Sequence, residues 1–151
     1  MISRRSVLKA VFTGGAIAGL GVMMPRIALA AWNATAFETD SQDAAMGAMY
    51  DSAPAASADV NLKAPDIAEN GAVVPITIQA DLPNVESISL LVDENPNPLA
   101  AHYKVGKGLR PYVSTRIKMG KTSAVHAVVK ADGQLMKTTK EIKVTIGGCG
   151  G

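Results

Sequence analysis

The sequence has little of what most enzymes and disulfide-stabilised proteins contain. It has one cysteine in 151 residues, so no disulfide can form within the chain. Aromatic residues make up only 4% of it, so a core must be built from Val, Ile, Leu and Met. We find no Ser-His-Asp order, no phosphate-binding loop and no cluster of side chains at metal-ligand spacing. The sequence therefore predicts neither a cofactor nor a metal.

The first 30 residues have the pattern of an export signal. A basic segment contains Arg4 and Arg5, an uncharged stretch covers residues 10–25, and Ala28 and Ala30 form a small-x-small cleavage site. The paired arginines indicate the twin-arginine pathway, which exports folded proteins. The uncharged stretch is shorter than the roughly 20 apolar residues of a membrane span. We therefore predict that residues 1–30 are cleaved, which leaves a periplasmic protein without a membrane anchor.

The positive charge of the chain belongs to this signal. The whole sequence carries 15 Lys and Arg against 13 Asp and Glu, but residues 1–30 hold four of the basic residues and no acidic one. The remainder therefore has 11 basic and 13 acidic side chains, a net charge of −2. A weakly acidic chain of this kind gives no reason to expect nucleic-acid binding.

Three parts follow the signal. Residues 31–57 predict a short helical segment and a linker, with Thr39, Asp40 or Ser41 as the helix cap. Residues 58–146 alternate apolar and polar side chains as the strands of a β-sandwich domain do. Residues 147–151 form a short, flexible C-terminal arm.

About seven strands are predicted in residues 58–146. They lie near residues 60–63, 73–80, 86–93, 101–105, 111–119 and 123–131, and a last run ends at Ile146. Asp132-Gly133 predicts a hairpin turn, and Pro75 should confine its run to a sheet edge or a bulge. Short strands at this regular spacing predict an all-β, immunoglobulin-like sandwich.

The remaining side chains with chemical potential have structural interpretations. His102 and His126 lie on predicted strands without ligand partners, so surface or packing roles are expected. Four methionines should also pack in the fold, namely Met46, Met49, Met119 and Met136. A second group suggests either a basic patch near a partner surface or a solvated face: Arg110, Arg116, Lys118 and Lys121.

The C-terminal arm is the most informative segment. The only cysteine, Cys149, stands among glycines in Gly147-Gly148-Cys149-Gly150-Gly151. The three residues from Gly147 to Cys149 span at most about 10 Å, enough to place a sulfur atom inside a narrow cleft. Glycines have no side chains to collide with the walls of that cleft. No residue of the arm activates the thiol, so we expect Cys149 to be an attachment point and not a catalytic nucleophile.

Two other interpretations of the arm remain. The first is an exported interaction module in which Cys149 forms an intermolecular disulfide. The second uses the terminal Gly150-Gly151 carboxylate, as ubiquitin-like proteins do. That route needs adenylation by ATP, which is not expected in an exported compartment.

Several segments of the chain resemble the SoxY family, the thiol-bearing subunit of the SoxYZ carrier in bacterial thiosulfate oxidation. The most specific is the C-terminal run from Ile142 to Gly151, which contains the carrier cysteine. The others are residues 68–75, 95–100 and 114–119. The resemblance covers the mature chain and implies an immunoglobulin-like sandwich that carries sulfur on Cys149 without catalysing a reaction.

The resemblance also implies a set of partners. A SoxZ-like subunit would form a heterodimer with this chain and be exported with it. A SoxAX-like heme enzyme would join thiosulfate oxidatively to Cys149, and a SoxB-like hydrolase would release the terminal sulfonate as sulfate. A SoxCD-like dehydrogenase, where present, would oxidise the remaining sulfane sulfur.

Overall fold

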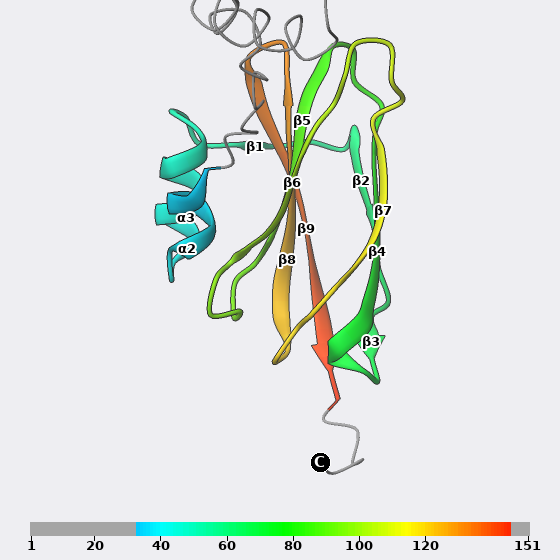
Figure 1. The fold of residues 1–151 in the computed structure, drawn as a ribbon. Helices are drawn as coiled ribbons and strands as arrows, with labels where there is room; N and C mark the ends of the chain where they lie inside the picture. Colours follow the sequence, from blue (N-terminus) through cyan, green and yellow to red (C-terminus); the bar gives the residue numbers. More distant parts are fainter. Residues whose placement is uncertain (1–32, 146–151) are drawn as a thin grey trace, which may run out of the picture. The chain divides into compact units, whose positions relative to one another are not determined.

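The computed structural model describes residues 33–145, which form two β-sheets and two short helices (Figure 1). Residues 1–32 and 146–151 lie outside the described part of the chain. Within residues 33–145, no helix is long and apolar enough to cross a membrane.

The larger sheet is organised around its last strand. Its strands run in the order β1 (Ala55–Ala56), β9 (Gln134–Val144), β8 (Ser123–Ala131), β5 (Val85–Val92) and β6 (Leu99–Lys104), and β3 (Ile67–Ala68) also pairs with β9. β8 and β9 form a hairpin closed by Ala131 and Gln134. Asp132 and Gly133 between them have positive φ angles of 49° and 73°, as a two-residue turn of the I′ type requires. The predicted hairpin is confirmed.

The smaller sheet has three antiparallel strands in the order β2 (Val60–Lys63), β4 (Val74–Ala80) and β7 (Tyr112–Ile117). Pro75 was expected at an edge or a bulge, but it lies in β4, the central strand. The reason is local, because the pairing of β2 with β4 begins only at Thr77. At Pro75 the strand therefore has β7 as its one neighbour, and the missing N–H is tolerated as it is at a sheet edge.

The main core lies between the two sheets. Alternate residues of β4 point inward, and Val74, Ile76 and Ile78 are almost fully buried. They meet an inward row of the larger sheet that includes Ile88, Leu90, Val92, Val125, Val129 and Ile142. Aliphatic side chains dominate this cluster, as the low aromatic content of the sequence predicts.

A second core lies on the outer face of the larger sheet, where the helices pack. Leu91, Leu99, Val128 and Leu135 are buried there together with Ala36 and Ala45. β5 is therefore covered on both faces, since Leu90 points to the main core and Leu91 to the helices. A register shift between these two residues marks a β-bulge.

The predicted helical segment is two helices and not one, α2 (Ala34–Glu38) and α3 (Gln42–Met49). Asn33 caps α2 by accepting a hydrogen bond from the Ala36 amide, and Ser41 caps α3 by accepting one from Ala44. The backbone is extended at Thr39 and Ser41, so the helix stops and starts again at these polar residues. Ser41 was one of the three predicted caps.

The predicted fold class is confirmed as an all-β, immunoglobulin-like sandwich with a short helical part at its N-terminal side. The described residues contain seven strands of four or more residues, at the predicted places to within a few residues. The two-residue strands β1 and β3 were not predicted. Each is defined only by its parallel pairing with β9. A segment of two residues is too short to show the alternation by which strands are predicted.

The packing of the helices can be tested with two leucines. Leu91→Ala should lower the free energy of unfolding by about 3 kcal/mol, because it opens a cavity between β5 and the helices. Leu109→Ala removes the same atoms from a side chain that is 67% exposed and should change stability by less than about 0.5 kcal/mol. Urea unfolding followed by circular dichroism measures both. Equal effects would show that the helices do not form a cooperative unit with the sheet.

Candidate functional site

The residues predicted to carry the function lie outside the described part of the chain. This holds for Cys149 and the flanking Gly147, Gly148, Gly150 and Gly151, and for the signal residues Arg4, Arg5, Ala28 and Ala30. The structure does describe the end of β9 from which the arm departs. We call residues Lys143, Val144 and Thr145 the arm base.

Every backbone N–H of the arm base donates a hydrogen bond. Lys143 donates to the Asp66 carbonyl at 3.0 Å, and Thr145 donates to the Ala68 carbonyl at 3.1 Å. Val144 points the other way and donates to the side-chain oxygen of Thr122 at 3.0 Å. The chain is therefore held on both sides up to the last described residue.

Thr122 lies in a turn that is itself fixed to a neighbouring loop. The side chain of Asn95 donates to the Lys118 carbonyl at 2.8 Å, and the Glu94 amide donates to the hydroxyl of Ser123 at 3.0 Å. Lys121 and Glu94 add an ion pair at 3.4 Å between exposed side chains. These contacts hold the turn of residues 118–123 against the loop that follows β5.

Gly71 permits a close approach at the other side of the arm base. It belongs to a 3-10 turn, η1 (Gly71–Val73), and its carbonyl accepts a hydrogen bond from the Met119 amide at 2.7 Å. A Cβ atom at this position would lie 2.3 Å from the Met119 carbonyl oxygen and 2.9 Å from a methyl group of Val144. Only glycine fits between these groups without a shift of the backbone.

An ion pair fixes the segment that leads into β3. The Lys140 ammonium lies 2.9 Å from the Asp66 carboxylate and donates to the Ala64 carbonyl at 2.5 Å. The hydrogen bond from Lys140, and then its charge, lower the pKa of Asp66. Asp66 is highly exposed, so this pair positions β3 against β9 more than it stabilises the fold.

The methionines pack as predicted. Met119 is 2% exposed and belongs to the main core, which Met136 also contacts. Met46 and Met49 pack against the cluster beneath the helices. Met119 therefore acts at the arm base through its packing and its backbone contact with Gly71.

His126 is a buried structural residue. Its Nδ1 lies 2.8 Å from the hydroxyl of Thr139, and its Nε2 lies 3.0 Å from the Asp93 carboxylate. The side chain joins β8 to β9 and to the end of β5. No group of three or more metal-ligating side chains lies together within residues 33–145.

His102 belongs to a second hydrogen-bonded chain, beneath the end of α3. The hydroxyl of Tyr50 lies 2.6 Å from that of Ser89, which lies 2.9 Å from His102 Nδ1. Burial lowers the pKa of His102, and the positive charge of Lys104 lowers it further. The neutral ring is therefore favoured in the folded protein, where it connects β6 to β5.

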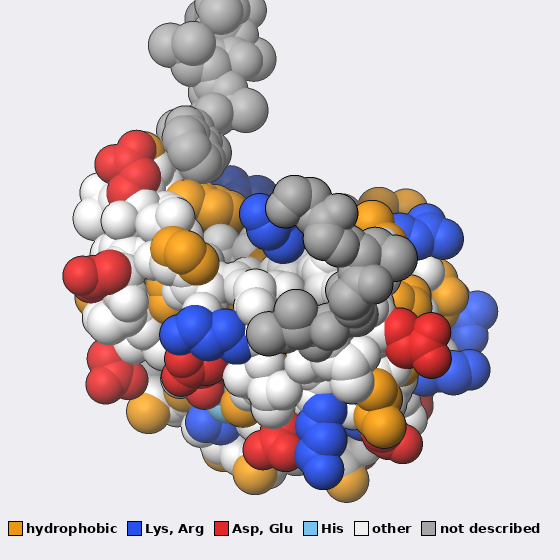
Figure 2. All heavy atoms as spheres, turned by 90° about the horizontal axis from the view of Figure 1, so that it is seen from below, with side chains coloured by type: hydrophobic (Ala, Val, Ile, Leu, Met, Phe, Trp, Pro, Cys, Tyr) orange, Lys and Arg blue, Asp and Glu red, His pale blue; other side chains and the backbone are white. Residues whose placement is uncertain are grey.

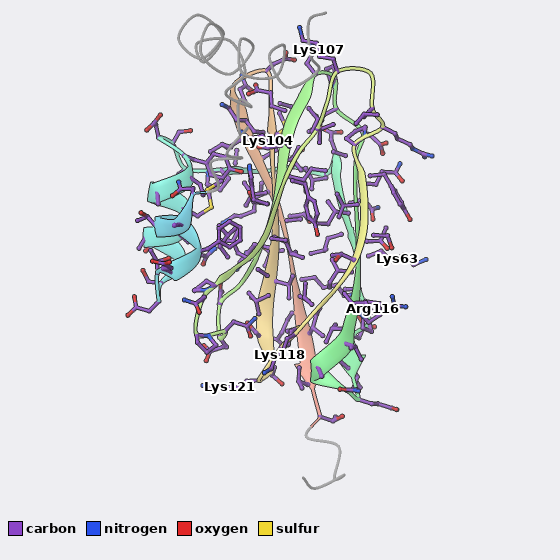
Figure 3. All side chains as sticks on the ribbon, viewed as in Figure 1. Lys63, Lys104, Lys107, Arg116, Lys118 and Lys121 are labelled. Atoms are coloured by element: carbon purple, nitrogen blue, oxygen red, sulfur yellow. The ribbon has the colours of Figure 1, made fainter. Side chains whose placement is uncertain are left out.

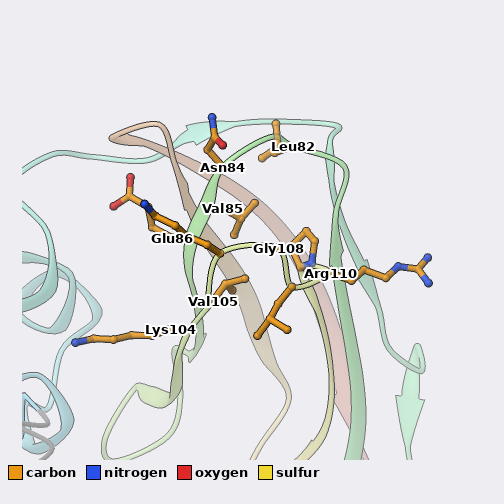
Figure 4. Close-up of a pocket in the computed structure, with 12 residues that line it drawn as sticks. Leu82, Asn84, Val85, Glu86, Lys104, Val105, Gly108 and Arg110 are labelled. Atoms are coloured by element: carbon orange, nitrogen blue, oxygen red, sulfur yellow. The ribbon is translucent and has the colours of Figure 1, made fainter.

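A hollow of about 940 Å³ lies at the end of the sandwich opposite the arm base (Figure 4). Lys104 and Arg110 line it, but their charged ends extend in opposite directions. Glu86 at its rim is engaged by the Gly133 amide and by Lys130, which together lower the pKa of its carboxyl group. The charged ends of Lys104 and Arg110 therefore do not converge on the hollow.

The four predicted basic residues do not form one patch. Lys121 is paired with Glu94, and the Arg110 guanidinium lies 6.0 Å from the centre of the Tyr112 ring. Arg116 on β7 and Lys63 on β2 project from the outer side of the small sheet, whereas Lys118 lies just beyond the end of β7, near Lys121 (Figure 3). The structure thus places Lys63 near Arg116, and Lys121 differs from Lys118 in having an acidic partner.

Comparison with known proteins identifies the family. The model of the family described as sulfur oxidation protein SoxY matches residues 45–149, so the match ends at the only cysteine. The chain belongs to the SoxY family. No match was found among curated protein sequences.

Two solved structures are similar to this chain. The sulfur carrier protein SoxY from Chlorobium limicola f thiosulfatophilum is 40% identical, with a TM-score of 0.63, and the match covers 69% of this chain and 96% of that one. A variant of the superoxide reductase (neelaredoxin) from Ignicoccus hospitalis is 20% identical with a TM-score of 0.51, covering 57% of this chain and 79% of that one. The second likeness shows a shared fold alone.

Sequence reasoning did not find the residues that hold the arm base. Thr122 and Gly71 act through contacts with Val144, which is distant in the sequence. A weak signal existed for Gly71, because Asn70-Gly71 is a turn-forming pair inside one of the segments that resemble the family. Nothing in the local sequence marks Thr122.

Gly71→Ala tests the close approach at the arm base. The added methyl group must displace the backbone of residue 119, so we expect a loss of about 1–3 kcal/mol in the free energy of unfolding. Gly120→Ala is the control, because a Cβ there meets nothing within 4 Å. Chemical unfolding compares the two, and an equal, small effect would contradict the packing described here.

The lowered pKa of His102 predicts a pH dependence of stability. A base whose pKa is lower in the folded state stabilises the fold while it is neutral, and that contribution is lost as the pH falls through the folded-state pKa. Stability should therefore fall as the pH falls below the ordinary pKa of histidine, 6.5. His102→Gln should reduce this slope, as measured by urea unfolding at each pH. An unchanged slope would exclude His102 as its source.

Proposed function

We propose that this chain is a periplasmic sulfur carrier that holds thiosulfate-derived intermediates covalently on Cys149 and presents them to successive enzymes. The observation that carries the proposal is the family match that runs to residue 149, the single cysteine of the chain. The relative from Chlorobium limicola is itself named as a sulfur carrier protein. The carrier is not an enzyme, and it needs no cofactor besides the sulfur bound to Cys149.

The geometry of the arm base supports this role. Hydrogen bonds fix the chain up to Thr145, and the four residues from there to Cys149 span at most about 14 Å. The sulfur of Cys149 can therefore reach only positions within a short distance of Thr145. Tethering within such a radius keeps an intermediate at high effective concentration beside a docked enzyme.

The chemistry divides between the carrier and its enzymes. Loading joins the Cys149 thiolate to the outer sulfur of thiosulfate in a new S–S bond, and two electrons pass to the heme groups of a SoxAX-like enzyme. Hydrolysis by a SoxB-like enzyme adds water across the bond between sulfur and the sulfonate. That step releases sulfate and two protons and leaves a persulfide on Cys149. A SoxCD-like dehydrogenase would oxidise that sulfur where it is present.

The proposed location follows from the N-terminal pattern. Export through the twin-arginine pathway takes place after folding, so a SoxZ-like subunit without its own signal would cross the membrane as a heterodimer with this chain. Cleavage after Ala30 leaves the carrier in the periplasm without a membrane anchor.

Cys149→Ser tests the attachment point. The variant should fold and bind the SoxZ-like subunit as the original chain does, because Cys149 lies beyond the hydrogen-bonded end of β9. Thiosulfate-dependent turnover in the reconstituted system should fall to background, since no covalent intermediate can form. Full turnover would refute the proposal.

Mass spectrometry of the exported, non-reduced protein separates the proposal from the disulfide alternative. A carrier should show thiosulfate or sulfane adducts on its C-terminal peptide after incubation with thiosulfate and the loading enzyme. A reductant-sensitive dimer without adducts would instead favour an interaction module.

A further inference from the structure

The outer faces of the two sheets differ in what covers them. α2 and α3 pack on the larger sheet and bury its outer apolar residues. No described element packs on the outer face of the three-stranded sheet, where Pro75, Tyr112 and Arg116 are exposed. We call the outward side chains of β2, β4 and β7, together with Lys118, the bare face.

The bare face combines an apolar centre with positive charge. A depression of about 570 Å³ crosses all three strands, and Pro65, Pro75 and Tyr112 are among the residues that line it. Tyr112 is 49% exposed, although large apolar and aromatic surfaces are normally buried. Exposed Tyr and Arg around an apolar centre are typical of surfaces that bind proteins.

The cations of the bare face lack partners. Within residues 33–145, Lys63, Arg116 and Lys118 form no ion pair, whereas Lys121, Lys130 and Lys140 each do. The sequence from Asn95 to Ala131 contains no Asp or Glu. Viewed from the arm end, acidic side chains gather mainly on the side of the helices and basic ones mainly on the opposite side (Figure 2). The free charges of the bare face thus match a partner that presents carboxylates.

The bare face is continuous with the arm base. β7 leads through Lys118 to Met119, whose amide is bonded to Gly71 beside Val144. Because the arm reaches at most about 14 Å from Thr145, an enzyme that receives Cys149 must contact the carrier close to that residue. Arg116 lies on the outer side of the small sheet and Lys118 lies just beyond the end of β7, toward the arm base, and both side chains are exposed (Figure 3).

We propose that the bare face is the docking surface for enzymes that receive the arm, and that these enzymes contact it with an acidic surface beside their active-site cleft. The inference rests on the proposed carrier function and adds the site and the chemistry of the contact. Its charged and polar composition suits a short-lived complex, since permanent interfaces are larger and more apolar. Attraction between opposite charges speeds the association of such partners, and salt weakens that attraction.

The test uses the full-length carrier, bound to its SoxZ-like subunit, as an inhibitor. The Cys149→Ser chain cannot be loaded, so it should inhibit the loading and hydrolysis of the original chain competitively. Adding Arg116→Glu and Lys118→Glu should weaken this inhibition at least tenfold for one or both enzymes, and higher salt should reduce the difference. Adding Lys104→Glu and Lys107→Glu is the matched control, because it changes the net charge equally at the opposite end of the sandwich.

The outcomes separate the docking proposal from the proposed function. Equal inhibition by the two charge-reversal variants would overturn the docking surface and leave the carrier function intact. Loss of SoxZ-like subunit binding by Arg116→Glu and Lys118→Glu would also overturn it, since the bare face would then belong to the heterodimer. If the original chain is not loaded at all, the carrier function fails. Direct binding of each enzyme to the variants then still decides whether the bare face docks it.

Discussion

The pairing of β9 with its neighbours is the constraint on which the rest of the structure depends. β9 forms the long hairpin with β8, pairs with β1 near its beginning and with β3 at its end, and supplies Ile142 to the main core. The same strand ends in the arm base. A segment that must leave the fold at one fixed point is thus attached to a strand that pairs with three others.

Neighbouring residues of the larger sheet pack in different cores, because they point to opposite faces. Leu90 closes the sandwich, while Leu91 anchors the helices. Because the helices cover one outer face, the other sheet holds the uncovered apolar and basic surface next to the arm. The asymmetry gives the carrier one outer sheet face that is covered by helices and one that no described element covers.

Alternation of apolar and polar residues predicted the main strands well, since it reports on burial of one face and is a local property. Ser123–Ala131 was predicted with its observed bounds. Alternation also located β4, but Pro75 suggested an edge strand, and β4 is the central strand of its sheet with a single neighbour at Pro75. Whether a neighbour is present at a given residue depends on where β2 stops pairing, and that is decided by a distant segment. The short strands β1 and β3 were missed for the same reason.

The sequence by itself determined that one thiol stands among glycines at the end of a strand-rich chain, and that family membership follows from segments along its length. The glycine content, the single cysteine and the alternation of apolar and polar residues are properties of neighbouring residues, so they can be recognised in the sequence alone. Only the tertiary structure decided how the arm base is held. Thr122 and Gly71 meet Val144 because non-local pairing brings three separated segments together. Tertiary packing also decided that the helices cover the larger sheet, so Lys63, Arg116 and Lys118 stay exposed elsewhere.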